Sequence, residues 1–148
     1  MAVTDQETPG LSDETMAIVA STAPVLEEHG LAITTRLYER LFMYHPETKA
    51  LFVGAAPDQA DKLAAAVLAY AQNITNIESL VPAVTGIAER HVAAGVAPHH
   101  YEIVGSELLA SMIDVLGGLD ESIVQAWASA YGFLANIFIG IESQMVEQ

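Results

Sequence analysis

Helical spacing of apolar side chains is the feature of this sequence that most restricts its fold. In the C-terminal stretch, apolar residues recur at steps of three and four positions. Such steps keep side chains on one face of an α-helix, so this stretch is predicted to be a helix that lies across a core. The residues concerned are Ile123, Trp127, Tyr131, Leu134, Phe138, Ile141 and Met145.

The same spacing continues upstream, and the alternation typical of β-strands is almost absent. Ser12, followed by two acidic residues, predicts a helix start, and Gly30 is predicted to end that first helix. Pro46 predicts a short turn that ends near Phe52. We expect an all-α fold of about seven helices without a sheet, with residues 1–10 as a flexible N-terminal arm and residues 11–148 as one domain. Further helices are predicted over 59–74, 80–92, 101–116 and from about 120 onward, with a loop over 53–57.

Composition narrows the classes of function. The chain has 148 residues, of which 52% are apolar, enough for one folded domain with a substantial core. Its formal net charge of −14 would repel nucleic-acid phosphates, so we expect no nucleic-acid partner. The absence of cysteine excludes disulfides and thiolate-ligated metals. With no signal-peptide pattern and no apolar run of about 20 residues, the chain is expected to lack a membrane span and to be cytoplasmic.

A histidine lies on the apolar face of the helix predicted over 80–92. Leu80, Val84, Ile87 and His91 follow one another at steps of four, three and four, so they share that face. An imidazole in an apolar setting tends to stay neutral, and a neutral imidazole is a good ligand for iron. A buried structural histidine with a hydrogen-bond partner would give the same pattern, and spacing alone leaves both interpretations open.

Three other polar residues lie on or near apolar faces. Glu142 falls near the inward stripe of the last helix, where it could accept the second N–H of His91; a solvated residue on a fraying turn is the alternative. Tyr38 could donate a hydrogen bond to a bound ligand or to a local acceptor. Gln59 lies at the start of its helix, and its amide could overhang the cavity that would hold such a ligand, or it could face water.

Several other chemistries lack the residues they need. The sequence has no glycine-rich phosphate loop and no Glu-x-x-His motif of a di-iron bundle. The few basic residues could face the carboxylates of a cofactor, or each could be solvated. They are Arg36, Arg40, Lys49, Lys62 and Arg90.

Four stretches together resemble the single-domain bacterial haemoglobins and the globin domain of flavohaemoglobins. They read LYERLFMYHPETKALF at 37–52, LAYAQNI at 68–74, IAERHVAAGVAPHHYEIVGSELL at 87–109 and AWASAYGFLANIFIGIE at 126–142. The resemblance covers most of the chain from residue 30 onward, and it implies a globin fold with helices packed around a haem pocket. The sequence departs from the family in a short loop between Phe52 and Gln59, and in Arg90 where many relatives carry lysine.

On one side of the haem, the resemblance implies a network of three residues. His91 matches the proximal ligand to the iron of haem b, which is iron protoporphyrin IX. Tyr101 matches a tyrosine near that histidine, and Glu142 matches the acid that pairs with it. A carboxylate partner of this kind makes an imidazole more basic.

On the other side, the resemblance implies a distal pocket. Tyr38 matches the tyrosine that hydrogen-bonds bound dioxygen, and Gln59 and Leu63 match the distal glutamine and the apolar residue beside it. Phe52 matches the phenylalanine that packs on the haem after Pro46.

The function implied by the resemblance is reversible binding of dioxygen, with nitric oxide dioxygenation as the expected activity. Expected partners are O2, NO and other small haem ligands, together with a separate flavin or nicotinamide reductase, since no fused reductase is expected. Relatives are often dimers, so a homodimer is considered too. The alternatives are an oxygen carrier or store that supplies respiration, a haem-based gas sensor with a separate partner, and a haem-free helical protein.

Overall fold

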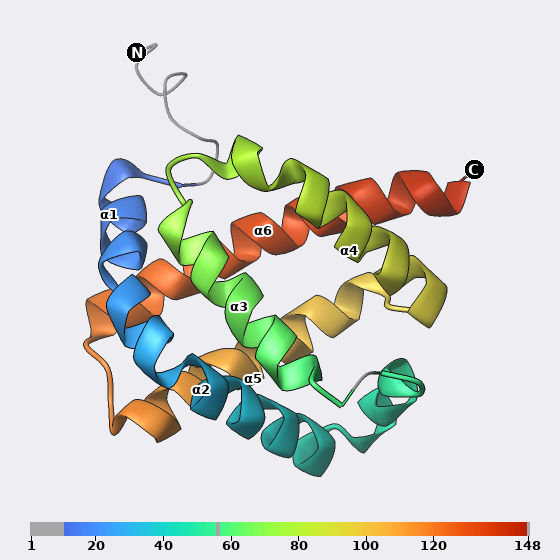
Figure 1. Cartoon of the computed structure of the whole chain (residues 1–148), viewed down its shortest axis with the longest axis horizontal. Helices are drawn as coiled ribbons and strands as arrows, with labels where there is room; N and C mark the ends of the chain where they lie inside the picture. Colours follow the sequence, from blue (N-terminus) through green and yellow to red (C-terminus); the bar gives the residue numbers. More distant parts are fainter. Residues whose placement is uncertain (1–10, 56, 148) are drawn as a thin grey trace.

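The chain forms a bundle of crossing helices, shown in Figure 1 as a computed structural model. The structure describes residues 11–55 and 57–147, and within these ranges it contains six α-helices, two 3-10 helices and no strand. The predicted all-α fold is therefore confirmed. The arm predicted for residues 1–10 lies outside the described residues. The elements are α1 (Asp13–Ser21), α2 (Ala23–Tyr44), η2 (Pro46–Phe52), α3 (Gln59–Gln72), η3 (Ile77–Leu80), α4 (Val81–Ala94), α5 (Pro98–Leu116) and α6 (Glu121–Glu147).

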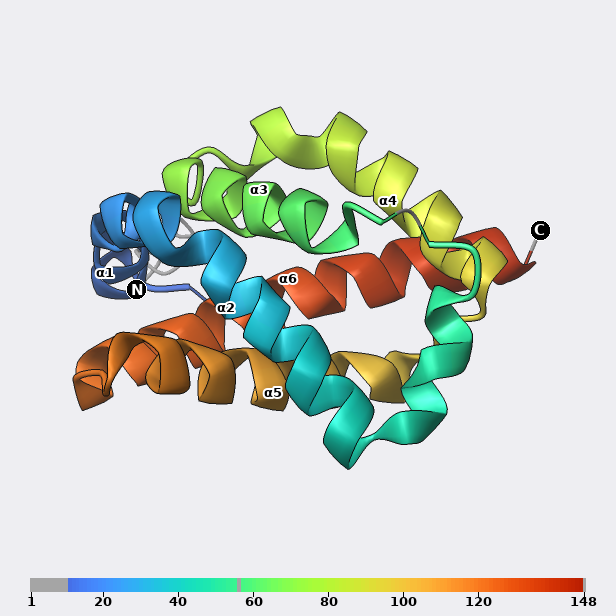
Figure 2. The ribbon, with the colours of Figure 1, turned by 60° about the horizontal axis from the view of Figure 1, so that its bottom comes forward.

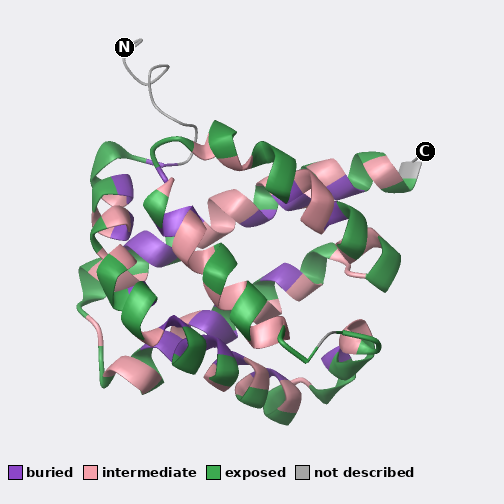
Figure 3. Ribbon diagram, viewed as in Figure 1, coloured by how far each residue is buried: buried purple, intermediate pink, exposed green. Residues whose placement is uncertain are grey.

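Helices that are far apart in the sequence pack against one another. α2 contacts α3 and α5, while α6 contacts α1, α4 and α5. Figure 2 shows α3 and α4 on one side of the molecule and α5 on the other, with α6 between them. In Figure 3, buried and exposed residues alternate along the helices, as expected for helices with one face on a core.

The core consists of two clusters of buried side chains. The larger cluster joins α1, α2, α3, α5 and α6, and it includes Ile33, Leu37, Met112 and Trp127. The smaller cluster joins α4, α5 and α6 around Val84, Ala88, Tyr101, Ala135 and Phe138. Two residues of the predicted proximal network, Tyr101 and His91, thus belong to or adjoin the smaller cluster.

The prediction that the first helix ends at Gly30 is wrong. The chain breaks at Thr22 instead, and α2 begins there with Pro24 in its first turn and continues through Gly30. Gly30 is buried, and a Cβ atom added to it would lie 3.5 Å from the Cβ of Ala64 on α3. That distance is an ordinary van der Waals contact, so Gly30 is a buried position inside α2 that faces α3 and not the end of a helix.

The other predicted boundaries agree with the structure to within a few residues. The side chain of Ser12 accepts a hydrogen bond from the Thr15 backbone N–H at 3.0 Å, which confirms the predicted helix start. The turn after Pro46 is the 3-10 helix η2, which ends at Phe52 as predicted. Gly117 ends α5 with a φ of 74°, a backbone conformation that glycine adopts without strain.

α6 is long and apolar enough, over Glu121–Val146, to cross a membrane by length and composition alone. A core helix passes the same test, and the side chains of Trp127, Ala130 and Phe138 on α6 are buried against the other helices. The absence of a membrane span therefore stays a prediction.

Candidate functional site

His91, Tyr101 and Glu142 come from three different helices and meet in one place. The Nδ1 atom of His91 lies 2.8 Å from Tyr101 Oη and 3.0 Å from Glu142 Oε2. Tyr101 Oη donates to the same Oε2 atom over 2.6 Å. Because a carboxylate can only accept, Nδ1 carries the ring proton and donates it. The three residues, which we call the proximal triangle, form a closed hydrogen-bonded set.

The proximal triangle explains how a carboxylate can be buried near the end of α6. Glu142 is 7% exposed, and an ionised carboxylate in such a place needs hydrogen-bond donors. His91 and Tyr101 supply them. The alternative of a solvated Glu142 on a fraying turn is therefore wrong.

Burial keeps the phenol of Tyr101 protonated. It raises the pKa of Tyr101 far above the ordinary value, and the hydrogen bond to the negative Glu142 raises it further. Tyr101 therefore remains a donor to Glu142 over the whole physiological pH range. The Glu142 carboxylate therefore accepts hydrogen bonds from both the phenol of Tyr101 and the imidazole of His91.

Tight packing of α5 on α6 holds Tyr101 in place. Tyr131 on α6 donates its hydroxyl to the backbone carbonyl of Tyr101 over 2.7 Å. The ring of Tyr131 passes so close to Gly105 that a Cβ atom there would lie 2.6 Å from Tyr131 Cε2. The Phe138 ring lies 5.5 Å from the His91 ring and 6.0 Å from the Tyr101 ring, measured between centroids.

The proximal triangle fixes the tautomer of His91. With its proton on Nδ1, the neutral ring carries a free lone pair on Nε2, and the side chain is 33% exposed. A carboxylate hydrogen-bonded to one ring nitrogen makes the other a better metal ligand. His91 thus has the chemistry that a haem iron requires of its protein ligand.

A second group of predicted residues lies on α2, η2 and α3. The rings of Tyr38 and Phe52 meet edge to face with centroids 5.3 Å apart, and Phe42 lies within 6 Å of both rings. Burial raises the pKa of the Tyr38 phenol, and the neighbouring side chain of Gln59 offsets part of that shift. The structure therefore brings Tyr38 together with both Phe52 and Gln59. Leu63 is half-buried beside the larger core cluster.

A buried threonine sets the position of Gln59 relative to Tyr38. Thr34 on α2 is 1% exposed, and its Oγ1 donates to the backbone carbonyl of Ala60 over 2.8 Å. Ala60 follows Gln59 in the sequence, and Thr34 lies one helical turn before Tyr38. This hydrogen bond therefore ties the start of α3 to the part of α2 that carries Tyr38.

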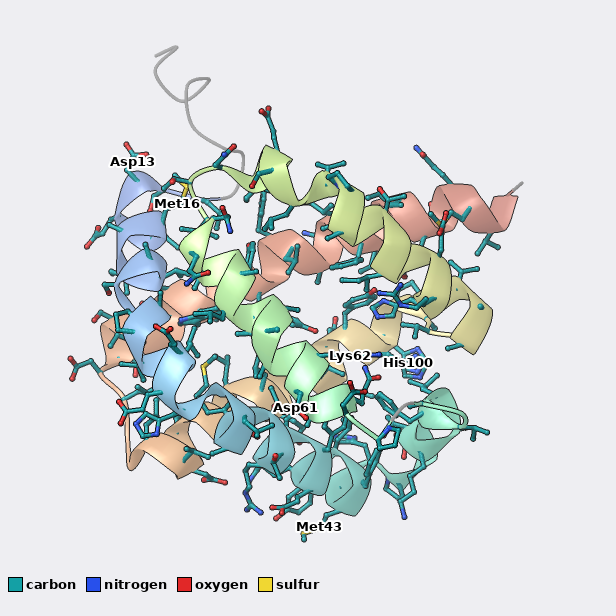
Figure 4. The ribbon with its side chains drawn as sticks, in the orientation of Figure 1. Asp13, Met16, Met43, Asp61, Lys62 and His100 are labelled. Atoms are coloured by element: carbon teal, nitrogen blue, oxygen red, sulfur yellow. The ribbon has the colours of Figure 1, made fainter. Side chains whose placement is uncertain are left out.

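Two of the arginines considered for cofactor carboxylates are occupied elsewhere. Arg36 pairs with Asp114 at 3.0 Å, and Arg40 pairs with Glu107 at 2.7 Å. Lys62 pairs with Asp58 at 3.7 Å, and Figure 4 shows Lys62 in the first turns of α3. For Lys49 and Arg90, on the surface, both interpretations remain open.

Sequence reasoning missed the buried carboxylate of Glu107. This residue is 8% exposed and lies beneath Arg40 and His45. The available signal was its spacing, since Glu107 lies four residues before the buried Ser111 and so shares a helix face with it. Spacing on α5 alone does not reveal a carboxylate that faces arginine and histidine on α2.

Some apolar side chains of α3 and α4 have exposed surface that a flat apolar cofactor would cover. Leu63 and Val67 of α3 and Ile87 of α4 are only half-buried, although each is packed against a core cluster. A haem site is built largely from such side chains, with few polar groups among them. Within residues 11–55 and 57–147, no three histidine or carboxylate side chains gather around a metal position. A haem needs only one, because its porphyrin supplies the other iron ligands.

A hollow of about 650 Å³ lies between α5 and α6, and Tyr101 of the proximal triangle is one of the residues that border it. It is also lined by Gly105 and Tyr131, among others, and neither His91 nor Tyr38 borders it. The candidate site is defined by the proximal triangle and by the group around Tyr38, because these residues can bind a cofactor and its ligand.

Comparison with known proteins shows to which family this chain belongs. The family model described as Globin matches residues 35–138. The chain belongs to the globin family. A globin-like protein of Aquifex aeolicus is 44% identical to it, over 93% of this chain and 99% of that protein.

Longer proteins also contain a region similar to this globin. A flavohemoprotein of Chromobacterium violaceum is 44% identical over 91% of this chain but only 34% of its own length, so the globin spans about a third of such relatives. A solved structure from Rhodothermus marinus has a TM-score of 0.88 and 37% identity, covering 93% of this chain and 96% of that one. It is described as an engineered carbene transferase made from a proposed nitric oxide dioxygenase. Globin membership and the flavohemoprotein relatives imply that the chain binds haem.

Proposed function

We propose that this globin holds haem b through His91, binds dioxygen reversibly, and converts nitric oxide with dioxygen to nitrate when a separate reductase supplies electrons. The proximal triangle of His91, Tyr101 and Glu142 is the observation that carries the proposal. A purely structural histidine would need one hydrogen-bond partner. His91 has a buried carboxylate and a phenol on one nitrogen, and its other nitrogen remains available.

The bound haem would supply an iron that coordinates a diatomic ligand and exchanges electrons. On the proximal side, His91 would hold that iron through Nε2. The negative charge of Glu142 acts on the ring through the Nδ1 proton and makes Nε2 a stronger electron donor. Axial-ligand electron donation is one of the means by which a protein favours oxygen chemistry over simple storage.

On the distal side, Tyr38 would face the ligand with its phenol proton in place. Its raised pKa keeps Tyr38 a hydrogen-bond donor at physiological pH. The side chain of Gln59 lowers the pKa of that phenol and is therefore its neighbour. The rings of Phe42 and Phe52 pack against the Tyr38 ring. A hydrogen bond to a charged acceptor stabilises by about 1.5–3 kcal/mol, enough to retain a ligand that draws negative charge onto its outer atom.

The comparisons support the choice of reaction. One structural neighbour is described as derived from a proposed nitric oxide dioxygenase, and several relatives are named flavohemoproteins. Turnover requires electrons, and we propose a separate flavin or nicotinamide reductase as their source. An oxygen carrier would use the same residues, so the reaction itself must be measured.

The test is to mix the dioxygen-loaded protein with nitric oxide in a stopped-flow instrument and to quantify nitrate. We expect rapid formation of ferric haem and one nitrate per haem, followed by continued turnover when a flavin reductase and NADH are added. Release of dioxygen without nitrate would contradict the dioxygenase proposal and leave an oxygen carrier.

A further inference from the structure

A second polar cluster lies where α2, η2 and α5 meet, and it contains none of the residues placed in the haem site. Glu107 on α5 accepts a hydrogen bond from Arg40 Nε over 2.7 Å through Oε1. Its other oxygen, Oε2, lies 3.2 Å from His45 Nε2. A carboxylate offers no proton, so the His45 ring donates here. Glu107 thus joins two different parts of the chain.

The two hydrogen-bond partners of Glu107 lie in different segments of the chain. Arg40 lies inside α2, and it also pairs with Asp114 at 3.2 Å, so its bond holds one helix to another. His45 is the residue that ends α2, with its ring 3.2 Å from Glu107 and 3.9 Å from Glu47. Of these two hydrogen bonds, only the one to His45 therefore holds the segment that follows α2.

His45 in turn fixes the beginning of η2. Its backbone carbonyl accepts from the Thr48 N–H over 2.9 Å and from Thr48 Oγ1 over 2.7 Å. Thr48 is 1% exposed, while Pro46, Glu47 and the two residues after Thr48 are exposed. A short segment with so few buried contacts depends on its anchors for its position.

The far end of η2 reaches the distal residues of the haem site. Phe52 ends η2 and packs edge to face on Tyr38, with centroids 5.3 Å apart, and on Phe42, with centroids 5.5 Å apart. Val53, the next residue, is 85% exposed. The position of the Phe52 ring is therefore set by contacts within the aromatic group and by the anchor at the start of η2.

We propose that Glu107 is a positioning residue for the distal pocket: by holding His45 against α5, it fixes η2 and thereby the placement of Phe52 against Tyr38. The effect on ligand binding rests on the proposed function, whereas the effect on η2 does not. Without the carboxylate, His45 loses its partner, η2 opens more often, and the phenol of Tyr38 samples a wider range of orientations.

The test compares Glu107→Gln and His45→Asn with a matched control, Asp114→Asn. The control removes the other carboxylate that pairs with Arg40 but does not touch His45. The first readout is hydrogen exchange of backbone amides in residues 47–52 of the haem-containing protein, measured by mass spectrometry. We expect exchange about tenfold faster or more in both variants, because each weakens the hydrogen bond between His45 and the Glu107 carboxylate. Exchange should be unchanged in the control, which leaves that bond in place.

The second readout is the C–O stretching band of the carbon monoxide complex, which reports whether Tyr38 donates to the ligand. Both variants are expected to shift this band in the direction of Tyr38→Phe, by a smaller amount, while Asp114→Asn keeps the wild-type band. A role limited to global stability would lower the melting temperature without this shift.

Several results would overturn the proposal. Unchanged exchange in both variants would show that Glu107 does not anchor η2. Faster exchange without a band shift would show that the position of η2 does not affect the hydrogen bond from Tyr38 to the ligand. If Asp114→Asn changed exchange as much as Glu107→Gln, the change would be due to the loss of a partner of Arg40 and not of His45. If Glu107→Gln does not fold, His45→Asn decides, since it keeps the Arg40–Glu107 pair. Failure of the protein to bind haem would refute the proposed function, and the exchange measurement would then be made on the haem-free protein, where it still tests whether Glu107 anchors η2.

Discussion

Glu142 is the residue that joins the other two members of the proximal triangle. Its carboxylate accepts from both His91 Nδ1 and Tyr101 Oη, and it is buried on α6. The family resemblance implied that Glu142 lies near His91, whereas helical spacing alone left a solvated Glu142 equally possible. That Tyr101 donates to the same oxygen atom could not be predicted, since it depends on how α5 crosses α6.

Replacing Glu142 with glutamine is expected to weaken haem retention. The amide oxygen can still accept from Nδ1, but the negative charge that makes Nε2 basic is lost. Removal of such a partner typically costs about 10–100-fold in metal affinity. The measurement is the rate of haem transfer to an excess of a haem-free acceptor globin.

The matched control for that substitution is Glu89→Gln. Glu89 lies on α4, two residues before His91, and is exposed. It should leave the transfer rate unchanged. Equal rates for Glu142→Gln and wild type would show that the carboxylate does not act through the imidazole.

Replacing Tyr38 with phenylalanine is expected to speed dioxygen release. The ring keeps its edge-to-face contact with Phe52, so the change removes only the hydroxyl. Loss of about 1.5–3 kcal/mol corresponds to a rate roughly 10–100-fold higher, measured by rapid mixing with carbon monoxide. Tyr44→Phe, with Tyr44 54% exposed on the same helix, is the control. An unchanged off-rate in Tyr38→Phe would remove this residue from the distal role.

At the scale of elements, periodicity predicted most helices, because each has one apolar face on the core. It failed at Gly30, which is part of α2 although glycine commonly ends a helix. The sequence alone does not distinguish a glycine that ends a helix from one that lies inside a helix on its buried face. Glu107 was missed for a similar reason, since its partners lie on α2 and in η2.

Two glycines in the helices of the proximal side lead to opposite predictions. A Cβ atom at Gly105 would lie 2.6 Å from Tyr131 Cε2, so Gly105→Ala must displace the ring that fixes Tyr101. We expect a loss of about 1–3 kcal/mol in the free energy of unfolding, measured with urea.

Gly132→Ala is the paired substitution on α6. No atom lies within 4 Å of a Cβ atom built there, so alanine adds helix propensity without a clash. A gain of up to about 1 kcal/mol is expected. If both substitutions had the same effect, the close approach of α5 and α6 at Gly105 would not be a determinant of stability.

At the scale of the whole molecule, three tyrosines whose hydroxyls are hydrogen-bonded inside the fold make folding sensitive to alkaline pH. Burial raises the pKa of Tyr70, Tyr101 and Tyr131 well above the ordinary value of 10. Each donates its hydroxyl proton in the folded protein, to Ala130, Glu142 and the Tyr101 carbonyl respectively. The folded protein therefore keeps protons that the unfolded chain releases above pH 10.

The sign of the pH dependence follows from this difference. Above about pH 10, the folded state binds more protons than the unfolded state, so the free energy of unfolding falls as the pH rises. Each tyrosine contributes a slope of at most about 1.4 kcal/mol per pH unit. Urea titrations between pH 8 and 11 should show Tyr70→Phe with a shallower slope than wild type, and Tyr44→Phe with the same slope as wild type. A wild-type curve that is flat through pH 11 would contradict the burial of these phenols.

The central claim is that the imidazole at position 91 binds haem iron through Nε2. The most direct measurement is the visible absorption spectrum of the haem-free protein titrated with haemin, for wild type and His91→Gly. We predict a Soret band at one haem per chain in the wild type, an altered spectrum in the variant, and recovery of the wild-type spectrum when free imidazole is added. Identical spectra for the two proteins would contradict this account.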